Sequence, residues 1–175
     1  MMLISRENEL SINPSFVRRE VLIIIKRNYS REELIRHASL TDSDIEQVNQ
    51  CRRDYNRLGF GYQIGFVRLE NRLPTQYKLE IIDDLLTFTS VQLQIDPNLI
   101  HQYQRRRQTI SQHQIRLLDY LKLQRFEPKH RQLLSHFLFE ESCRLEQTNA
   151  LLFLAEQFLR DKGILRPATS TLERI

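Results

Sequence analysis

The sequence predicts an all-α protein, a multi-helix bundle divided into two packed, helix-turn-helix-like lobes. Its 175 residues include only four glycines and five prolines, whereas a β-rich fold needs many turns. Leu, Gln, Arg and Glu are abundant, and these residues lose little side-chain freedom in a helix. Capping residues also recur in front of apolar stripes with helical spacing. We therefore expect no sheet of three or more strands.

The first helical lobe is expected over residues 1–71. Ser30 and Glu33 have the spacing of a capping box, and Thr41 and Asp44 have a weaker acidic form of it. The second cap opens a long pattern whose apolar positions share one face, namely Ile45, Val48, Tyr55, Tyr62, Phe66 and Leu69. Gly59 is the expected break that divides this stretch into two helices.

Three glycines in this stretch, Gly59, Gly61 and Gly65, superficially resemble a dinucleotide-binding fingerprint. That fingerprint requires a strand before it and a helix opening after it. Residues 50–56 precede the glycines and are charged, with a helical pattern. We therefore interpret the small residues at 61 and 65 as places where a neighbouring helix packs closely.

A second, basic helical lobe is expected over residues 80–166. Pro74 lacks the amide hydrogen that a helix interior needs, so residues 72–79 are predicted as a linker between the lobes. The expected helix starts after it are Asp96 with Pro97, Thr109 or Ser111, Pro128, and Thr148 or Asn149. The last of these helices is apolar nearly all round over 150–159, which predicts a central buried helix ending at Gly163.

Residues 167–175 are expected to begin one more helix. Ser170 and Glu173 have capping-box spacing, and the sequence stops within the first turn that follows. One turn is far shorter than the ~12 residues at which isolated helices become marginal. We therefore expect that the chain has been cut from a longer protein.

Positive charge is concentrated in one stretch of the chain. The net charge is +4, and residues 1–86 contain equal numbers of basic and acidic side chains. Residues 99–132 contain eight Lys and Arg against two acidic residues, with three histidines that can add charge. This surplus indicates a polyanionic partner. Charge alone leaves open the alternative of a solvated basic face that binds nothing.

We find no constellation of catalytic residues in the sequence. Asp83 and Asp84 are adjacent, as are Glu140 and Glu141, so in a helix each pair points about 100° apart. No histidines have i,i+4 spacing, and no Cys or His spacing suits zinc. We therefore predict a non-catalytic chain that uses no metal, no cofactor and no small-molecule substrate.

We expect the protein to be cytoplasmic. Cys51 and Cys143 fit two reduced thiols in an intracellular protein. The longest aliphatic run, Val21–Ile25, has five residues, against roughly 20 for a membrane span. Charged residues interrupt the start of the chain, where a signal peptide would lie.

The basic stretch 101–126 is the strongest candidate for DNA binding. Helix amides and Arg bind phosphate, and Gln and Arg bond base edges in the major groove. A recognition helix would be polar here in its first turns, with Leu117, Leu118 and Leu121 on the opposite, buried side. The predicted DNA-binding residues are Arg105, Arg106, Arg107, Thr109, Ser111, Gln112, His113, Gln114 and Arg116.

A second candidate cluster consists of Arg52, Arg53 and Arg57. Arg53 and Arg57 are four residues apart and share a helix face. Asp54 is the structural alternative, because it can pair with nearby arginines instead.

Residues 51–69 resemble the amino-terminal region of the Tn-three family of replicative transposases. Those proteins carry an Arg-x-x-x-Asn-Arg-Leu-Gly stretch and then an aromatic or aliphatic helix that ends in Arg. The matching positions are Arg52, Asn56, Arg57, Leu58, Gly59, Gln63, Val67 and Arg68. Three further blocks agree in order, at 91–97, 103–118 and 163–175. The resemblance covers roughly residues 30–175, and the role of residues 1–29 is left open.

The resemblance implies a function that composition alone does not give. Amino-terminal helical domains of this family recognise the terminal inverted repeats of the transposon in double-stranded DNA. A metal-binding RNase-H-like domain much farther along the chain performs strand transfer, and the full-length protein is expected to act as a homodimer on DNA. Two alternatives stay open at this point: an autonomous helical DNA-binding regulator, and a helical adaptor that binds protein.

Overall fold

The computed structural model describes residues 28–76, 78–142 and 148–175. Their helices are α2 (Arg31–Ala38), α3 (Asp42–Asn49), α4 (Asp54–Glu70), α5 (Asp83–Leu93), the 3-10 helix η1 (Pro97–Leu99), α6 (Ile100–Gln104), α7 (Arg107–Tyr120), α8 (Pro128–Ser142), α9 (Thr148–Asp161) and α10 (Thr169–Leu172). In this described part of the chain no strand forms, and one isolated parallel bridge pairs Gln124 with Ile164. The predicted all-α class is confirmed.

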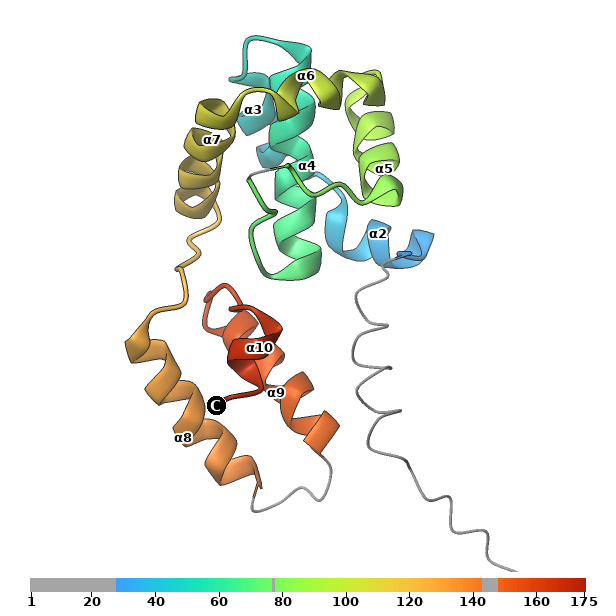
Figure 1. Ribbon diagram of the computed structural model, residues 1–175. Helices are drawn as coiled ribbons and strands as arrows, with labels where there is room; N and C mark the ends of the chain where they lie inside the picture. The colour runs from blue at the N-terminus through green and yellow to red at the C-terminus, as the bar shows by residue number, and fades with distance from the viewer. Residues whose placement is uncertain (1–27, 77, 143–147) are drawn as a thin grey trace, which may run out of the picture.

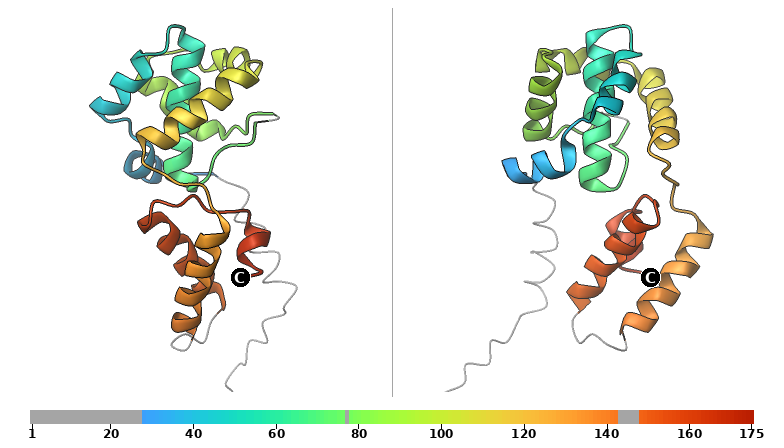
Figure 2. Two further views of the ribbon diagram at one scale, coloured as in Figure 1. Left: turned by 90° about the vertical axis from the view of Figure 1, so that its left-hand side faces the viewer. Right: turned by 180° about the vertical axis from the view of Figure 1, so that it is seen from behind.

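The helices form two groups (Figures 1 and 2). Helices α2–α7 gather around α4, and α8–α10 pack together at the other end of the molecule. Residues 121–127 lead from the first group to the second. The chain then returns beside this connection, because Gln124 N donates to Gly163 O over 2.9 Å and Leu165 N donates to Gln124 O over 2.8 Å.

Residues 72–79, expected as a linker between lobes, connect two helices that pack on each other. The Tyr62 hydroxyl of α4 donates to Glu80 O over 2.9 Å and accepts from Ile82 N over 3.0 Å. Leu79 is buried in the same core. Helix α4 ends at Glu70, with Asn71 in the left-handed conformation at its C-cap, and the core continues beyond it. The change from one helix group to the other falls at 121–127.

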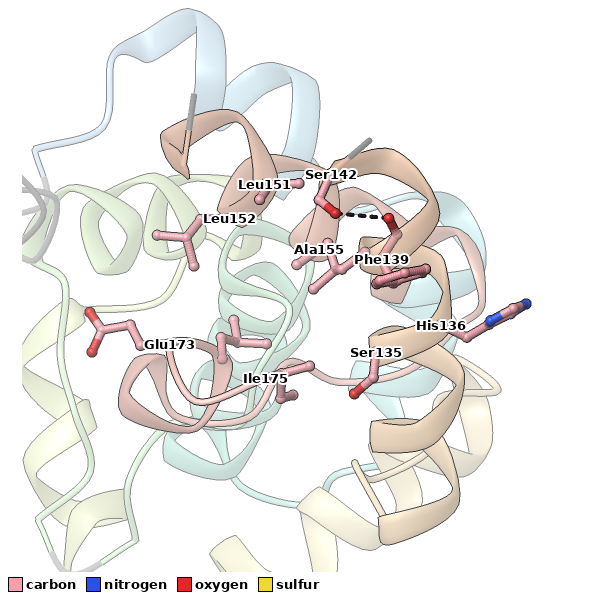
Figure 3. Close-up of a pocket in the computed structure, with 11 residues that line it drawn as sticks. Ser135, His136, Phe139, Ser142, Leu151, Leu152, Ala155, Glu173 and Ile175 are labelled. Carbon is pink, nitrogen blue, oxygen red and sulfur yellow. Dashed lines mark hydrogen bonds between the residues drawn. The ribbon is translucent and has the colours of Figure 1, made fainter. Parts of the chain in front are cut away.

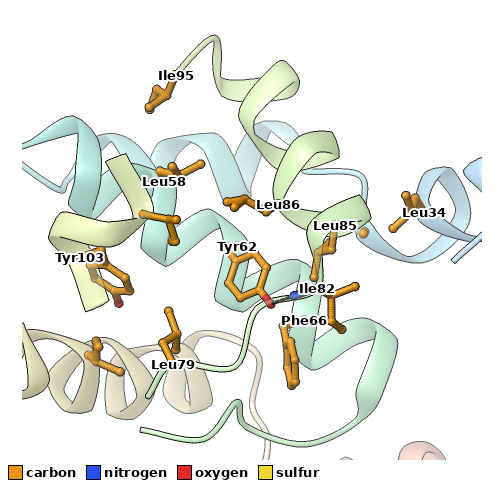
Figure 4. Packing of buried hydrophobic residues seen from close by; sticks show 13 residues of the cluster. Leu34, Leu58, Tyr62, Phe66, Leu79, Ile82, Leu85, Leu86, Ile95 and Tyr103 are labelled. Carbon is orange, nitrogen blue, oxygen red and sulfur yellow. Dashed lines mark hydrogen bonds between the residues drawn. The ribbon is translucent and has the colours of Figure 1, made fainter. Parts of the chain in front are cut away.

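Helix α4 is buried on two opposite sides. Leu58, Tyr62 and Phe66 pack into one cluster with α2, α5 and α6. Figure 4 shows Tyr62 and Phe66 beside Ile82 and Leu85 in this cluster. The other side of α4 packs against α3 and α7 through Phe60, Ile64 and Val67. A helix that contacts partners all round is the centre of this group.

The glycines of α4 allow its neighbours to approach closely. A Cβ at Gly61 would lie 2.9 Å from a methyl group of Leu93, and one at Gly65 would lie 2.9 Å from a methyl group of Leu85. The close packing predicted at 61 and 65 is therefore confirmed. The break predicted at Gly59 is wrong, because α4 is continuous there. A Cβ at Gly59 would overlap the Tyr103 ring.

Several predicted helix starts are confirmed. Ser30 Oγ accepts from Glu33 N over 3.2 Å, and Thr41 Oγ1 accepts from Asp44 N over 3.3 Å. The Glu33 and Asp44 carboxylates accept from the two cap amides in return, which completes both capping boxes. The Asp96 carboxylate caps η1, as expected.

Two other predicted caps are wrong. Helix α7 begins at Arg107, so Thr109 and Ser111 lie within the helix and not in front of it. Helix α10 has Ala168 at its N-cap and no side-chain cap, so the predicted capping box of Ser170 does not form. Residue types that favour N-caps therefore did not mark where α7 and α10 begin.

Helix α9 is not the central buried helix that its apolar sequence predicts. Ala155 and Leu159 are buried, while Phe153 is 62% exposed. The rings of Phe137 in α8 and Phe158 in α9 stack with their centroids 4.4 Å apart. Helix α9 thus packs on α8 through one face, because a group of three helices cannot surround it.

The second helix group is fastened to the C-terminal end of α4. The Arg160 guanidinium donates to Arg68 O over 2.6 Å and to Leu69 O over 3.1 Å. These are carbonyls of the last turn, which have no partner within the helix. Arg166 Nε donates to Glu70 O over 2.7 Å, and the guanidinium also pairs with the Glu70 carboxylate over 3.1 Å. Two arginines therefore cap α4 and hold the groups together.

We expect Gly59→Ala to destabilise the fold. The added methyl group meets the Tyr103 ring, and overpacking a core costs about 1–3 kcal/mol, offset in part by a helix-propensity gain of about 1 kcal/mol. Gly61→Ala is the matched control, because it has the same propensity gain and its nearest contact is the flexible end of the Leu93 side chain, at 2.9 Å. Urea unfolding measures both variants, and equal stabilities would contradict this packing at Gly59.

Candidate nucleic-acid interface

The two arginine clusters predicted from the sequence lie at one end of the molecule. Arg52 and Arg53 occupy the turn between α3 and α4, Arg105 and Arg106 join α6 to α7, and Arg107 is the first residue of α7 (Figure 1). The Arg106 guanidinium lies over the ring of Tyr55, in the first turn of α4, 5.7 Å from its centroid. This contact brings the two segments together. The exposed side chains that form this surface, named the basic end, are Arg52, Arg53, Arg105, Arg106 and Arg107.

Arg57, the third member of the second cluster, is bound within the protein. Its Nη2 donates to Asn49 Oδ1 over 2.7 Å, and its Nη1 pairs with Asp54 over 3.2 Å. The pairing with Asp54 that the sequence suggested as an alternative is confirmed. Arg57 therefore ties the end of α3 to the start of α4 and positions the turn between them.

Helix α7 has a buried and an exposed face. Ile110, Gln114 and Leu117 are buried, and Thr109 and Ser111 are half-buried at the boundary. The exposed residues at three- or four-residue steps, named the outward face of α7, are Gln108, Gln112, Ile115 and Asp119. The basic end lies at the N-terminal end of this face.

The prediction that the polar side chains of this stretch point away from the core is wrong for Gln114. Gln114 is 2% exposed. Its Nε2 donates to Pro74 O over 3.1 Å, and its Oε1 accepts from Gln76 Nε2. Gln114 thus fastens the segment after α4 to α7, and in this arrangement its amide cannot reach a base edge.

Arg116 is half-buried and joins α7 to the end of α3. Its Nη2 donates to Gln47 O over 2.6 Å and to Gln50 Oε1 over 2.8 Å. Its guanidinium also lies 4.6 Å from the centroid of the Phe60 ring. These contacts use the guanidinium N–H groups that Arg116 would need to form two hydrogen bonds with one guanine.

His113 belongs to a polar network beneath α7. The Tyr103 hydroxyl accepts from Gln63 Nε2 over 2.5 Å and lies 2.8 Å from His113 Nδ1. His113 Nε2 faces Cys51 Sγ over 3.8 Å. Burial, together with the nearby Arg116 charge, lowers the pKa of His113 to about 4. His113 is therefore neutral at pH 7, with one ring nitrogen against the Tyr103 hydroxyl and the other against the Cys51 thiol.

Sequence reasoning missed two features of this surface. Ile115 points outward and is 64% exposed, and Tyr55 supports Arg106. Lys122 and Arg125, which belong to the predicted basic stretch, are exposed just beyond the far end of α7. The spacing of three and four residues between positions 108 and 119 is the sequence pattern from which the outward face could have been predicted.

The described residues offer little for other chemistry. No group of three or more His, Cys, Asp or Glu side chains within 28–76, 78–142 and 148–175 could hold a metal ion. A search of the same residues finds no helix with the length and apolar character needed to cross a bilayer.

These features define an all-helical protein with an arginine-rich end beside an exposed helix face. The chain matches the family described as Domain of unknown function (DUF4158) over residues 17–175, and it belongs to that family.

Several relatives of the chain are transposases. It is 34% identical over 152 residues to the transposase for transposon Tn501 of Pseudomonas aeruginosa and 31% identical over 134 residues to that for transposon Tn1546 of Enterococcus faecium. It is also 26% identical over 150 residues to that for transposon Tn3926 of Escherichia coli. These alignments include 75–83% of the chain but 13–15% of each relative. The resemblance to the Tn-three family of transposases is confirmed.

We expect Gln114→Ala to lower the stability of the fold and Gln112→Ala to leave it unchanged. Removing a buried, hydrogen-bonded amide strands its partners and costs about 1–3 kcal/mol, whereas an exposed substitution usually stays within about 0.5 kcal/mol. Thermal unfolding distinguishes them. A Gln114→Ala protein as stable as Gln112→Ala would show that the contacts with Pro74 and Gln76 contribute nothing.

We expect the stability of the protein to fall as the pH is lowered from about 6.5 to about 4. In this window the unfolded His113 takes up a proton that the folded one, with its lowered pKa, does not. The unfolding free energy therefore decreases by at most about 1.4 kcal/mol per pH unit from this residue. His113→Gln should flatten the profile between pH 6.5 and 5, measured by urea unfolding. If the two proteins gave parallel profiles, the folded state would not lower the pKa of His113.

Proposed function

We propose that this chain is the DNA-binding part of a transposase and that it recognises the terminal inverted repeats of its transposon. The observation that carries the proposal is the convergence of Arg52 and Arg53 with Arg105–Arg107 at one end of the outward face of α7. Guanidinium groups bind phosphate, and phosphate contacts supply most of the affinity of a DNA-binding protein. The transposase relatives support the same function.

The dimensions of α7 suit a helix lying obliquely across the major groove. Its 14 residues span about 21 Å, and the major groove is about 12 Å wide. The basic end lies at one end of α7, and Lys122 and Arg125 lie just past the other. Basic groups at both ends can meet the phosphates of the two strands that border the groove.

The proposal assigns the chemical steps to other parts of a longer protein. The chain spans 13–15% of the length of the transposases it matches. We therefore propose that strand cleavage and transfer take place outside this chain and that DNA binding here needs no cofactor. The full-length protein would act in the cytoplasm as a homodimer on DNA.

A protein-binding adaptor is the second candidate, favoured by a cavity in the other helix group. This cavity of about 780 Å³ lies between α8, α9 and α10 (Figure 3). Apolar side chains such as Leu138, Leu152 and Ile175 line it. A folded chain with no affinity for any duplex would favour this function over DNA binding.

We expect replacement of Arg105, Arg106 and Arg107 by Ala to weaken binding to repeat and scrambled duplexes alike, because phosphate contacts do not read sequence. Three lost contacts should reduce the slope of log K against log salt by roughly 2.7, at ~0.9 per phosphate. The melting temperature should change little, since all three side chains are exposed and the contact of Arg106 with Tyr55 is worth about 0.5–1 kcal/mol at an exposed site.

The matched control removes the same charge elsewhere, through Ala at Arg31 and Arg36 on α2 and at Lys162 just after α9, which are exposed and away from the basic end. Fluorescence anisotropy over a range of salt concentrations measures both triple variants. Equal affinities and slopes for the two would refute DNA binding at the basic end.

A further inference from the structure

We infer that Ile115 contacts the 5-methyl group of a thymine in the major groove and so makes the outward face of α7 selective for thymine. This inference rests on the proposed DNA-binding function and specifies how the same surface would read a base pair. The observation that carries it is an aliphatic side chain, 64% exposed, in line with two exposed glutamines on a helix whose two ends are basic.

Ile115 is held outward by the packing of the rest of α7. Gln114 and Leu117 are buried on the opposite side, and the next residue, Arg116, is bonded to α3. Because these contacts fix the rotation of the helix about its axis, Ile115 cannot turn into the core. A β-branched side chain also has little freedom about χ1, so the exposed methyl groups occupy a defined place.

Charge argues for DNA as the occupant of this face. A single exposed apolar residue is ordinary on a protein surface, but Ile115 lies midway between two basic positions. At 1.5 Å per residue it is about 12 Å along the axis from Arg107 and about 10 Å from the level of Lys122. The two basic positions are thus about 22 Å apart along the axis. This exceeds the groove width of about 12 Å, so a helix placed obliquely across the groove can hold Ile115 over the bases with a basic group near each phosphate backbone.

In the major groove, the base pairs present one apolar group, the 5-methyl group of thymine. Gln112 lies one turn and Gln108 two turns before Ile115 on the same face, and a glutamine amide can bond adenine bidentately. Asp119 comes one turn after Ile115, and its negative charge disfavours phosphate there. The base-reading part of the face is therefore Gln108, Gln112 and Ile115.

A thymine-to-uracil scan of the repeat duplex tests this contact, because each substitution removes a single methyl group and keeps all hydrogen bonds. Burial of one methyl group corresponds to about a fourfold change in Kd. We expect one or two substitutions to weaken binding of the full chain about fourfold each. With Ile115→Ala these substitutions should have no effect, while Ile115→Val should give an intermediate response.

Val91→Ala is the matched control, since Val91 is 71% exposed on α5, on another side of the group. It should leave the uracil response intact, and melting temperatures should show all variants folded. A chain that prefers the repeat over a scrambled duplex but ignores every uracil substitution would overturn the contact with Ile115 and leave the proposed function standing. The same holds if the uracil response persists in Ile115→Ala. If the unaltered chain bound no duplex at all, both proposals would be overturned.

Discussion

The ring of Tyr103 occupies the space that a side chain at position 59 would fill, and the arrangement of the first helix group depends on this contact. Tyr103 also accepts from Gln63 of α4 and bonds His113 of α7 through its hydroxyl. The Tyr103 side chain of α6 thus packs on the central helix α4 and also positions α7, the helix that follows. The α6–α7 corner, with its arginines, is placed by the same packing.

This placement explains how an exposed helix face is held rigidly. Gln114 and Arg116 fasten α7 to the segment after α4 and to the end of α3, so its outward face is oriented before a ligand arrives. A surface ordered in advance loses less conformational freedom on binding. At the other end of α4, Arg160 and Arg166 cap its carbonyls and hold the second helix group.

The sequence was sufficient for the all-α class, for two of the three predicted capping boxes and for the location of the arginines, because these depend on local spacing. It could not show that Gln114 is buried, since its partners Pro74 and Gln76 lie some 40 residues away. The residue type alone does not show whether a polar side chain in a helix faces solvent or the core, because this depends on its tertiary partners. Ile115 was hidden for the converse reason, because an apolar residue is normally assigned to the core. DNA contact by the predicted residues stays a prediction.

The proposed DNA site consists of the basic end and the outward face of α7. Amide chemical shifts recorded while the chain is titrated with a duplex of its terminal repeat test this most directly. We expect the largest changes at residues 51–55 and 104–116, with small changes in α2 and α5. Changes confined to α8–α10 around their apolar cavity, with α7 unaffected, would contradict it.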